Sequence, residues 1–201
     1  MEPKVYLVIV DPQNDFIEGG ALAVSGAQKA MDELAQLLNE VPTLFSKIFV
    51  TQDFHPIDHC SFIENGGTWP RHCVENTFGA EIYPPLKAAL DKAFNVEYCK
   101  KGEDKEHDQY SIFDFQDSEI KNKYGKKMCK EITNRKNFIV FLTGIAGDVC
   151  VLNTLKDFLN FVNNDQIFVY RNFTASLDGG KKLDSFCKEN SVKMFNFEII
   201  Q

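Results

Sequence analysis

One segment of the chain joins a short apolar run to a helical pattern through a glycine, and this junction restricts the fold more than any other feature. Residues 138–142 are apolar, Thr143 and Gly144 follow, and apolar residues then recur at a helical spacing up to Val162. The run is far shorter than the roughly 20 residues that cross a bilayer. It therefore predicts a buried strand, a tight turn and a helix whose first turn contains Cys150.

Five further segments have the length and apolar character of strands. They are residues 5–10, 48–50, 95–99, 166–170 and 192–195, and helical patterns occupy residues 27–41, 118–136 and 177–190. Strands that alternate with helices predict an α/β fold: a doubly wound, mostly parallel six-stranded sheet with helices on both faces. The chain has 201 residues, enough for one sizeable core, so residues 1–201 are assigned to a single domain.

Composition argues against several classes of function. The formal net charge is −7 at pH 7 and no Lys/Arg-rich block is flanked by aromatic residues, so a nucleic-acid-binding surface is not expected. No apolar run could span a membrane, and the first residues lack the layout of a signal peptide. Six scattered cysteines without a Cys-x-x-Cys pair indicate reduced thiols. We therefore predict a cytoplasmic protein without a nucleic-acid or membrane partner.

Polar side chains follow four of the predicted strands. Asp11 follows the first, Asp53 and His55 the second, Lys101 the third and Cys150 the fourth. Doubly wound sheets bind ligands beyond the carboxyl ends of their strands, near the switch in strand order. We therefore expect these side chains to converge on one rim of the sheet.

The residue types at this rim suit a cysteine hydrolase of amides. Cys150 is the candidate nucleophile, because the free N–H groups and the dipole at a helix start lower the pKa of a thiol. Asp11 would accept the thiol proton, and Lys101 would keep Asp11 ionised. The N–H groups of Ala146 and Cys150 would form an oxyanion hole. On its own segment, Cys150 could equally be a small buried apolar residue.

A second group of residues suits a metal ion. Asp53 and His55 are two apart in an extended segment and therefore face the same side, and His72 lies in a long glycine- and proline-rich loop predicted between residues 56 and 85. Two histidines and a carboxylate suit zinc, with iron or manganese as alternatives, and leave positions open for water or substrate. The sequence leaves open whether a further ligand comes from His59, Ser61 or Glu64.

Seven short motifs, spread from residue 11 to residue 151, form a specific combination. They are Asp11-Pro12-Gln13-Asn14-Asp15-Phe16, Gly19-Gly20-Ala21-Leu22, Asp53-Phe54-His55-Pro56, Trp69-Pro70-x-His72-Cys73, Lys101-Gly102, Tyr110-Ser111-x-Phe113 and Gly144-Ile145-Ala146-x-Asp148-x-Cys150-Val151. Together they resemble the nicotinamidases of the isochorismatase-like cysteine hydrolase superfamily. The Asp-x-His and Trp-Pro-x-His-Cys motifs favour this branch over relatives that generally lack the metal set.

The resemblance implies an amidase that converts nicotinamide to nicotinate and ammonia for NAD salvage. It implies a catalytic triad of Asp11, Lys101 and Cys150, and one divalent metal ion that holds the pyridine nitrogen. The metal ligands that it implies are Asp53, His55 and His72. The implied substrate contacts are Phe16, Trp69, Tyr110, Ile145 and Ala146, with a cis peptide bond between the last two. Gly147 departs from the threonine that is common in the family.

Two other interpretations remain at this stage. One is a metal-independent, isochorismatase-like hydrolase that acts on another small amide or on isochorismate. The other is a catalytically inactive binding or scaffold protein, which is disfavoured because no residue of the triad Asp11, Lys101 and Cys150 has been replaced. The sequence does not give the metal identity, the range of amides accepted or the oligomeric state, and a homo-oligomer is compatible with it.

Overall fold

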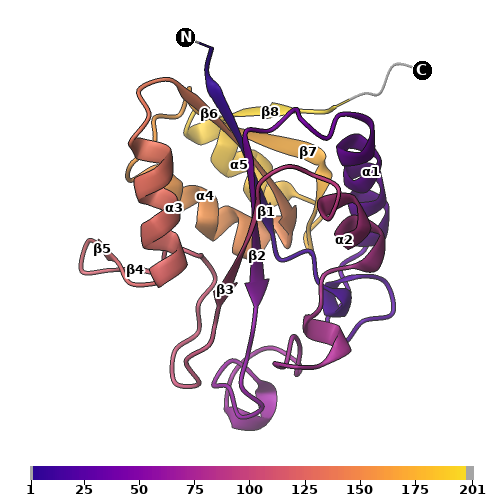
Figure 1. Cartoon of the computed structure of the whole chain (residues 1–201). Coiled ribbons are helices and arrows are strands. Elements are labelled where there is room, and N and C mark those ends of the chain that lie inside the picture. Colours follow the sequence, from indigo (N-terminus) through magenta and orange to yellow (C-terminus); the bar gives the residue numbers. More distant parts are fainter. Residues whose placement is uncertain (1, 198–201) are drawn as a thin grey trace.

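Six parallel strands form the central sheet of the molecule (Figure 1). The structure is a computed structural model that describes residues 2–197. In chain order the strands are β1 (Lys4–Val10), β2 (Lys47–Asp53), β3 (Val96–Lys101), β6 (Phe138–Ile145), β7 (Ile167–Ala175) and β8 (Lys193–Phe195). Their spatial order is β3-β2-β1-β6-β7-β8, and every neighbouring pair is parallel. The predicted six-stranded sheet is confirmed.

Helices cover both faces of this sheet, as predicted. The first layer holds α1 (Ala27–Glu40) and α2 (Pro84–Leu90), and the second holds α3 (Lys123–Thr133), α4 (Leu152–Phe158) and α5 (Lys181–Glu189) (Figure 1). In β1, Leu7 and Ile9 belong to the core of the first layer, and Tyr6, Val8 and Val10 to that of the second. Successive side chains of a strand point to opposite faces, so a strand buried on both faces is an uninterrupted apolar run.

The helix predicted over residues 118–136 begins later in the structure, at Lys123. Asp117 and Ser118 have positive φ values of 49° and 64° and form a turn between two short strands, β4 (Phe115–Gln116) and β5 (Glu119–Ile120). Asn122 then caps α3, since its side-chain oxygen accepts a hydrogen bond of 2.8 Å from the N–H of Tyr124. Turn geometry and a capping residue therefore override the helical spacing of the preceding residues.

Two other helices also differ from the prediction. The helix predicted over residues 177–190 begins at Lys181, because Gly179 and Gly180 adopt positive φ values of 73° and 92° before it. Helix α2 was not predicted. It begins at Pro84, where proline is well tolerated in a first helical turn, and it is held by burial of Leu86, Ala89 and Leu90.

The order of the strands changes direction beside β1. The chain passes from β1 to β2 and β3 on one side and then crosses to β6 on the other. At the carboxyl ends, Val10 is paired with Gly144. A Cβ atom at residue 144 would lie 2.1 Å from the carbonyl oxygen of Val10, so only glycine allows β6 to approach β1 this closely. The residues that follow β1 and β6 therefore meet at the switch point.

Other predictions concern the chain as a whole. All six cysteines lie in the described part of the chain and are free thiols, as expected. Among residues 2–197, no helix combines the length and the apolar character that crossing a membrane requires. The assignment of residues 1–201 to one domain stays a prediction.

Candidate active site

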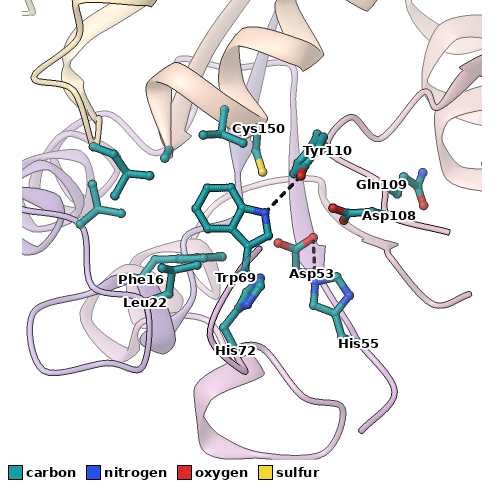
Figure 2. Close-up of a pocket in the computed structure, with 14 residues that line it drawn as sticks. Phe16, Leu22, Asp53, His55, Trp69, His72, Asp108, Gln109, Tyr110 and Cys150 are labelled. Carbon is teal, nitrogen blue, oxygen red and sulfur yellow. Dashed lines mark hydrogen bonds and ion pairs between the residues drawn. The ribbon is translucent and has the colours of Figure 1, made fainter. Parts of the chain in front are cut away.

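A pocket opens beyond the carboxyl ends of the strands, at the switch point (Figure 2). It contains about 420 Å³ of space that atoms do not fill, part of it open to solvent. Its walls are Phe16, Leu22, Val24, Asp53, His55, Trp69, His72, Asp108, Gln109, Tyr110, Ala146, Val149, Cys150 and Leu177. The predicted convergence of Asp53, His55 and Cys150 is therefore found, and completely buried Asp11 and Lys101 lie next to them.

Lys101 contacts the other polar groups of the predicted triad. Its Nζ atom lies 2.9 Å from Asp11 Oδ2, 2.5 Å from Asp53 Oδ1 and 3.7 Å from Cys150 Sγ. One carboxylate oxygen from each aspartate and the Cys150 sulfur lie within 4.8 Å of one another. The structure thus brings Asp11, Lys101 and Cys150 together and adds Asp53 to the same group.

The carboxylate of Asp11 is held from two sides. The hydroxyl of Thr51 donates a hydrogen bond of 2.6 Å to Oδ1, while Oδ2 faces the ammonium group of Lys101. The backbone N–H of Asp11 in turn lies 3.2 Å from the Thr51 hydroxyl oxygen. Asp11 has a φ of 48°, which is uncommon for a residue other than glycine. These contacts fix the carboxylate beside the thiol.

Burial changes the pKa values of all three groups. It raises the pKa of Asp11 to about 6, although the nearby Lys101 ammonium opposes this change. Burial lowers the pKa of Lys101, but Asp11 and Asp53 outweigh it and hold this pKa well above its ordinary value. Burial also raises the pKa of Cys150 well above its ordinary value, although Lys101 lowers it. The expectation that a helix start lowers the pKa of this thiol is therefore wrong, because burial outweighs it.

Cys150 lies in a helical turn, Gly147–Val151, that directly precedes α4. The peptide bond between Ile145 and Ala146 is cis, as the resemblance implies. The carbonyl of Ala146 accepts hydrogen bonds from Val149 and Val151, at 3.0 and 3.1 Å, and is thereby tied into the turn. Ala146 and Cys150 both line the pocket. An oxyanion hole formed by their N–H groups stays a prediction.

Three side chains next to Lys101 form a compact group of possible metal ligands, and one of them, Asp53, is paired with Lys101. One ligand atom from each of Asp53, His55 and His72 lies within 4.8 Å of the others, and all three residues are buried. The Nδ1–H groups of His55 and His72 donate to the carbonyls of Gly102 and Pro70, at 3.0 and 2.8 Å. These bonds leave Nε2 of each ring free to coordinate, as is usual for metal-bound histidines.

The electrostatics of this group also suit a cation. Burial, together with the neighbouring His59 and His72 rings, lowers the pKa of His55 to about 3, so its imidazole is neutral near pH 7. A neutral imidazole is the form that binds a metal. The donor set of two imidazoles and one carboxylate therefore fits a divalent metal ion.

The three candidates for a further ligand lie outside this group. His59 is completely buried and its ring lies over that of His55, with centroids 4.1 Å apart. Its Nδ1 is 2.7 Å from the Ser61 hydroxyl and its Nε2 is 3.3 Å from the carbonyl of His107, so both ring nitrogens are engaged. Glu64 is exposed and pairs with Arg71 at 2.6 Å. Among the described residues, neither His59 nor Glu64 joins Asp53, His55 and His72 in the group of possible metal ligands, and the Ser61 hydroxyl is engaged by the His59 ring.

Aromatic side chains form walls of the pocket, as predicted. The indole N–H of Trp69 donates to the hydroxyl of Tyr110 at 3.1 Å, which joins the loop after β2 to the loop after β3 (Figure 2). The centroid of the Phe16 ring lies 5.6 Å from that of the His72 ring. Ile145 is different, because it is completely buried in the core and lies outside the pocket wall.

Several supporting residues were not identified from the sequence. The carboxamide of Gln13 accepts from the N–H of Asp53 at 2.8 Å and donates to its carbonyl at 2.7 Å, which fixes the backbone of that residue. Gln13 belongs to the first motif but was given no role there, and Thr51 lies two residues before Asp53, so proximity to a strand end was an available signal for both. Asp108 and Leu177, which line the pocket, lie in polar or turn-rich segments that gave no such signal.

Comparisons with known proteins agree with this geometry. The family model described as the isochorismatase domain matches residues 5–182. The chain is 34% identical over 167 residues to the nicotinamidase of Acinetobacter baylyi, across 75% of this chain and 72% of that relative. The pyrazinamidase of Pyrococcus horikoshii in complex with zinc is 27% identical, with a TM-score of 0.79 over 97% of this chain and all of the other. PnC1 from L. infantum in complex with nicotinate is also 27% identical, with a TM-score of 0.80 over 98% and 96% of the two chains.

Proposed function

The chain belongs to the isochorismatase family, and from this premise we propose that it hydrolyses nicotinamide to nicotinate and ammonia. One observation carries the proposal: a single pocket combines a buried group of Cys150, Asp11 and Lys101 with a ligand set of two histidines and a carboxylate. The first group suits cleavage of an amide bond, and the second suits recognition of a ring nitrogen through a metal. Similarity to nicotinamidases at 34% identity supports the same substrate.

Asp11 is the general base of the first step in this proposal. Its carboxylate takes the proton of the Cys150 thiol while the sulfur attacks the carboxamide carbon. The N–H groups of Ala146 and Cys150 stabilise the negative charge on the carbonyl oxygen. Asp11 then passes the proton to the departing nitrogen, so that the carbon–nitrogen bond breaks, ammonia leaves and a thioester remains on Cys150.

Water completes the reaction through the same residues. Asp11 takes a proton from the water that attacks the thioester, and the carbon–sulfur bond breaks with return of a proton to Cys150. Nicotinate is released. Lys101 stays charged throughout, because Asp11 and Asp53 raise its pKa. It therefore acts as a fixed positive charge beside the thiolate rather than as a proton donor.

Zinc is the proposed ion for Asp53, His55 and His72, with iron or manganese as alternatives. Two imidazoles and a carboxylate are a donor set of catalytic zinc sites, and a zinc-bound structural relative supports the choice. When bound, the ion would supply a Lewis acid that holds the pyridine nitrogen. Phe16, Trp69 and Tyr110 would then pack against the ring and orient the carboxamide toward Cys150.

The surroundings of the protein are also part of the proposal. We place the enzyme in the cytoplasm, with free thiols and without a nucleic-acid or membrane partner. Whether it assembles as a homo-oligomer is tested by measuring its mass in solution. The small-molecule partner is supported by relatives whose structures hold nicotinate or the inhibitor nicotinaldehyde.

Ammonia release from nicotinamide, with metal analysis of the same sample, tests the proposal. Benzamide is the matched control, because it has the same shape without the ring nitrogen. We expect kcat/KM for nicotinamide to exceed that for benzamide by at least about tenfold in the zinc-loaded enzyme. Release of ammonia only from other amides, by a protein that binds no metal, would instead indicate a metal-independent hydrolase of the same family.

A further inference from the structure

Leu177 lines the pocket and yet is 47% exposed, so it lies at the mouth. Other apolar wall residues are nearly inaccessible: Phe16 is 5%, Val24 is 1% and Ala146 is 7% exposed. Leu22 is half-buried and lies beside Phe16, on the side of Trp69 away from Asp53 and His55 (Figure 2). The pocket therefore has a polar end at the metal ligands and an apolar, partly exposed part of its wall.

The backbone of Leu177 is tied to the turn that carries Cys150. Its N–H donates a hydrogen bond of 2.8 Å to Oδ1 of Asp148, a buried residue two positions before Cys150. The preceding residue, Ser176, packs on the same turn, since a Cβ atom at Gly147 would lie 2.1 Å from the Ser176 hydroxyl oxygen. The position of Leu177 is therefore fixed relative to the reacting sulfur.

The chain after Leu177 is also held in place. The carboxylate of Asp178 accepts hydrogen bonds from the N–H groups of Gly180 and Lys182, at 2.8 and 2.9 Å, and so ties residue 178 to the start of helix α5. The guanidinium of Arg171 donates to the carbonyl of Gly179 at 2.9 Å. Because it is anchored on both sides, the backbone of this segment keeps the Cα atom of Leu177 at the mouth of the pocket.

The orientation of the substrate follows from the proposed function, on which this inference rests. The carboxamide of nicotinamide would lie at Cys150 and the ring nitrogen at the Asp53, His55 and His72 end. Ring carbon 5 then points away from both attachment points, because it lies opposite carbon 2, which stands between them. Apart from Asp108 and Gln109, the wall residues that remain are apolar and include Leu22 and Leu177, so we place this edge of the ring against them.

We propose that Leu177 is a specificity-determining residue that restricts the substrates to single-ring aromatic amides without a bulky group on ring carbon 5. Its side chain closes part of the mouth against that edge of the ring. Removal of the side chain should open the mouth, and a larger side chain should close it further.

The test compares nicotinamide with nicotinamides that carry a methyl or a phenyl group on ring carbon 5. The value measured is the ratio of kcat/KM for the substituted amide to kcat/KM for nicotinamide, from ammonia release. In Leu177→Ala we expect this ratio to rise at least about tenfold for the phenyl compound, which is the usual scale of steric discrimination by a pocket. In Leu177→Trp the ratio for the methyl compound should fall.

Leu44→Ala is the matched control, because Leu44 is 41% exposed and lies outside the pocket wall. Its ratios should equal those of the unchanged enzyme. A Leu177→Ala ratio within about twofold of the unchanged enzyme would overturn the inference while leaving the proposed function intact. Failure of the unchanged enzyme to release ammonia from nicotinamide would overturn the proposed function and this inference with it.

Discussion

Asp53 Oδ1 lies 2.5 Å from Nζ of Lys101, so the candidate metal centre and the candidate catalytic triad share one ion pair. The same ammonium group is 2.9 Å from Asp11 Oδ2. One buried cation therefore stands between two buried carboxylates, and the group carries an excess of negative charge. This excess favours the binding of a further cation at Asp53.

Lys101→Ala should make the thiol of Cys150 harder to ionise. Removal of a positive charge 3.7 Å from the sulfur should move the pH profile of Cys150 alkylation upward, by about one pH unit or more. The two carboxylates would also lose their partner, with a loss of stability of about 3–5 kcal/mol. Iodoacetamide labelling against pH, with the modified cysteine identified by mass spectrometry, measures the first effect, and urea unfolding measures the second.

Lys100→Ala provides the control for this experiment. The Lys100 ammonium lies over the ring of Phe54, 3.4 Å from its centroid, and is not part of the triad. Its alkylation profile should match that of the unchanged protein. A profile that stays in place in Lys101→Ala as well would show that the lysine does not act on the thiol.

Cys150→Ala should abolish turnover but preserve the fold and the binding of nicotinamide. We expect kcat to fall by at least about 10³-fold, because the nucleophile is lost. In Asp11→Asn, kcat should fall nearly as far, because an amide cannot accept the proton. Steady-state ammonia release and calorimetric binding provide the two measurements. Cys187→Ala is the control. This cysteine is 1% exposed and is a buried residue of α5, so its replacement should leave kcat unchanged.

The positions of Asp11, Lys101 and Cys150 were predictable because each lies at the carboxyl end of a strand or in the segment that follows it. Parallel strands place their carboxyl ends along one edge, so a correct list of strands was enough to bring these residues together. The ion pair between Lys101 and Asp53 was not predictable in the same way. It depends on the register of β2 against β3, in which Asp53 stands opposite Lys101, and the sequence pattern does not specify that register.

The pKa of Cys150 shows a second limit of sequence reasoning. A helix start is a local feature that can be recognised from the chain, whereas complete burial of the thiol comes from residues distant in the sequence. Burial raises this pKa more than Lys101 lowers it. The same distinction applies to Leu177, whose place in the pocket depends on its bond to Asp148, 29 residues away in the chain.

Activity should decrease as the pH falls through the pKa of Asp11. Burial raises this pKa to about 6, so below that pH the carboxyl group is protonated and cannot accept the thiol proton. The Thr51 hydroxyl bond lowers the pKa, since it favours the ionised form. Thr51→Val should therefore shift the acid limb of kcat/KM to higher pH, and Thr51→Ser should leave it nearly unchanged. If the limb does not move in Thr51→Val, a different group controls it.

Gly102→Ala should weaken metal binding through the orientation of His55. A Cβ atom at residue 102, where φ is +67°, would lie 2.4 Å from Cε1 and 2.6 Å from Nδ1 of the His55 ring. The displaced ring would lose its 3.0 Å hydrogen bond to the Gly102 carbonyl. Its Nε2 atom would then no longer be held toward the ligand atoms of Asp53 and His72. Loss of such a supporting bond reduces metal affinity by about 10–100-fold, which zinc titration against a chelator measures directly.

Gly26→Ala separates this effect from backbone strain, because Gly26 has a φ of +81° with no atom within 4 Å of a Cβ. Both variants should lower the melting temperature, since a left-handed conformation costs about 1–2 kcal/mol for other residues. Only Gly102→Ala should lose zinc affinity, and equal affinity in the two variants would show that Gly102 does not orient His55.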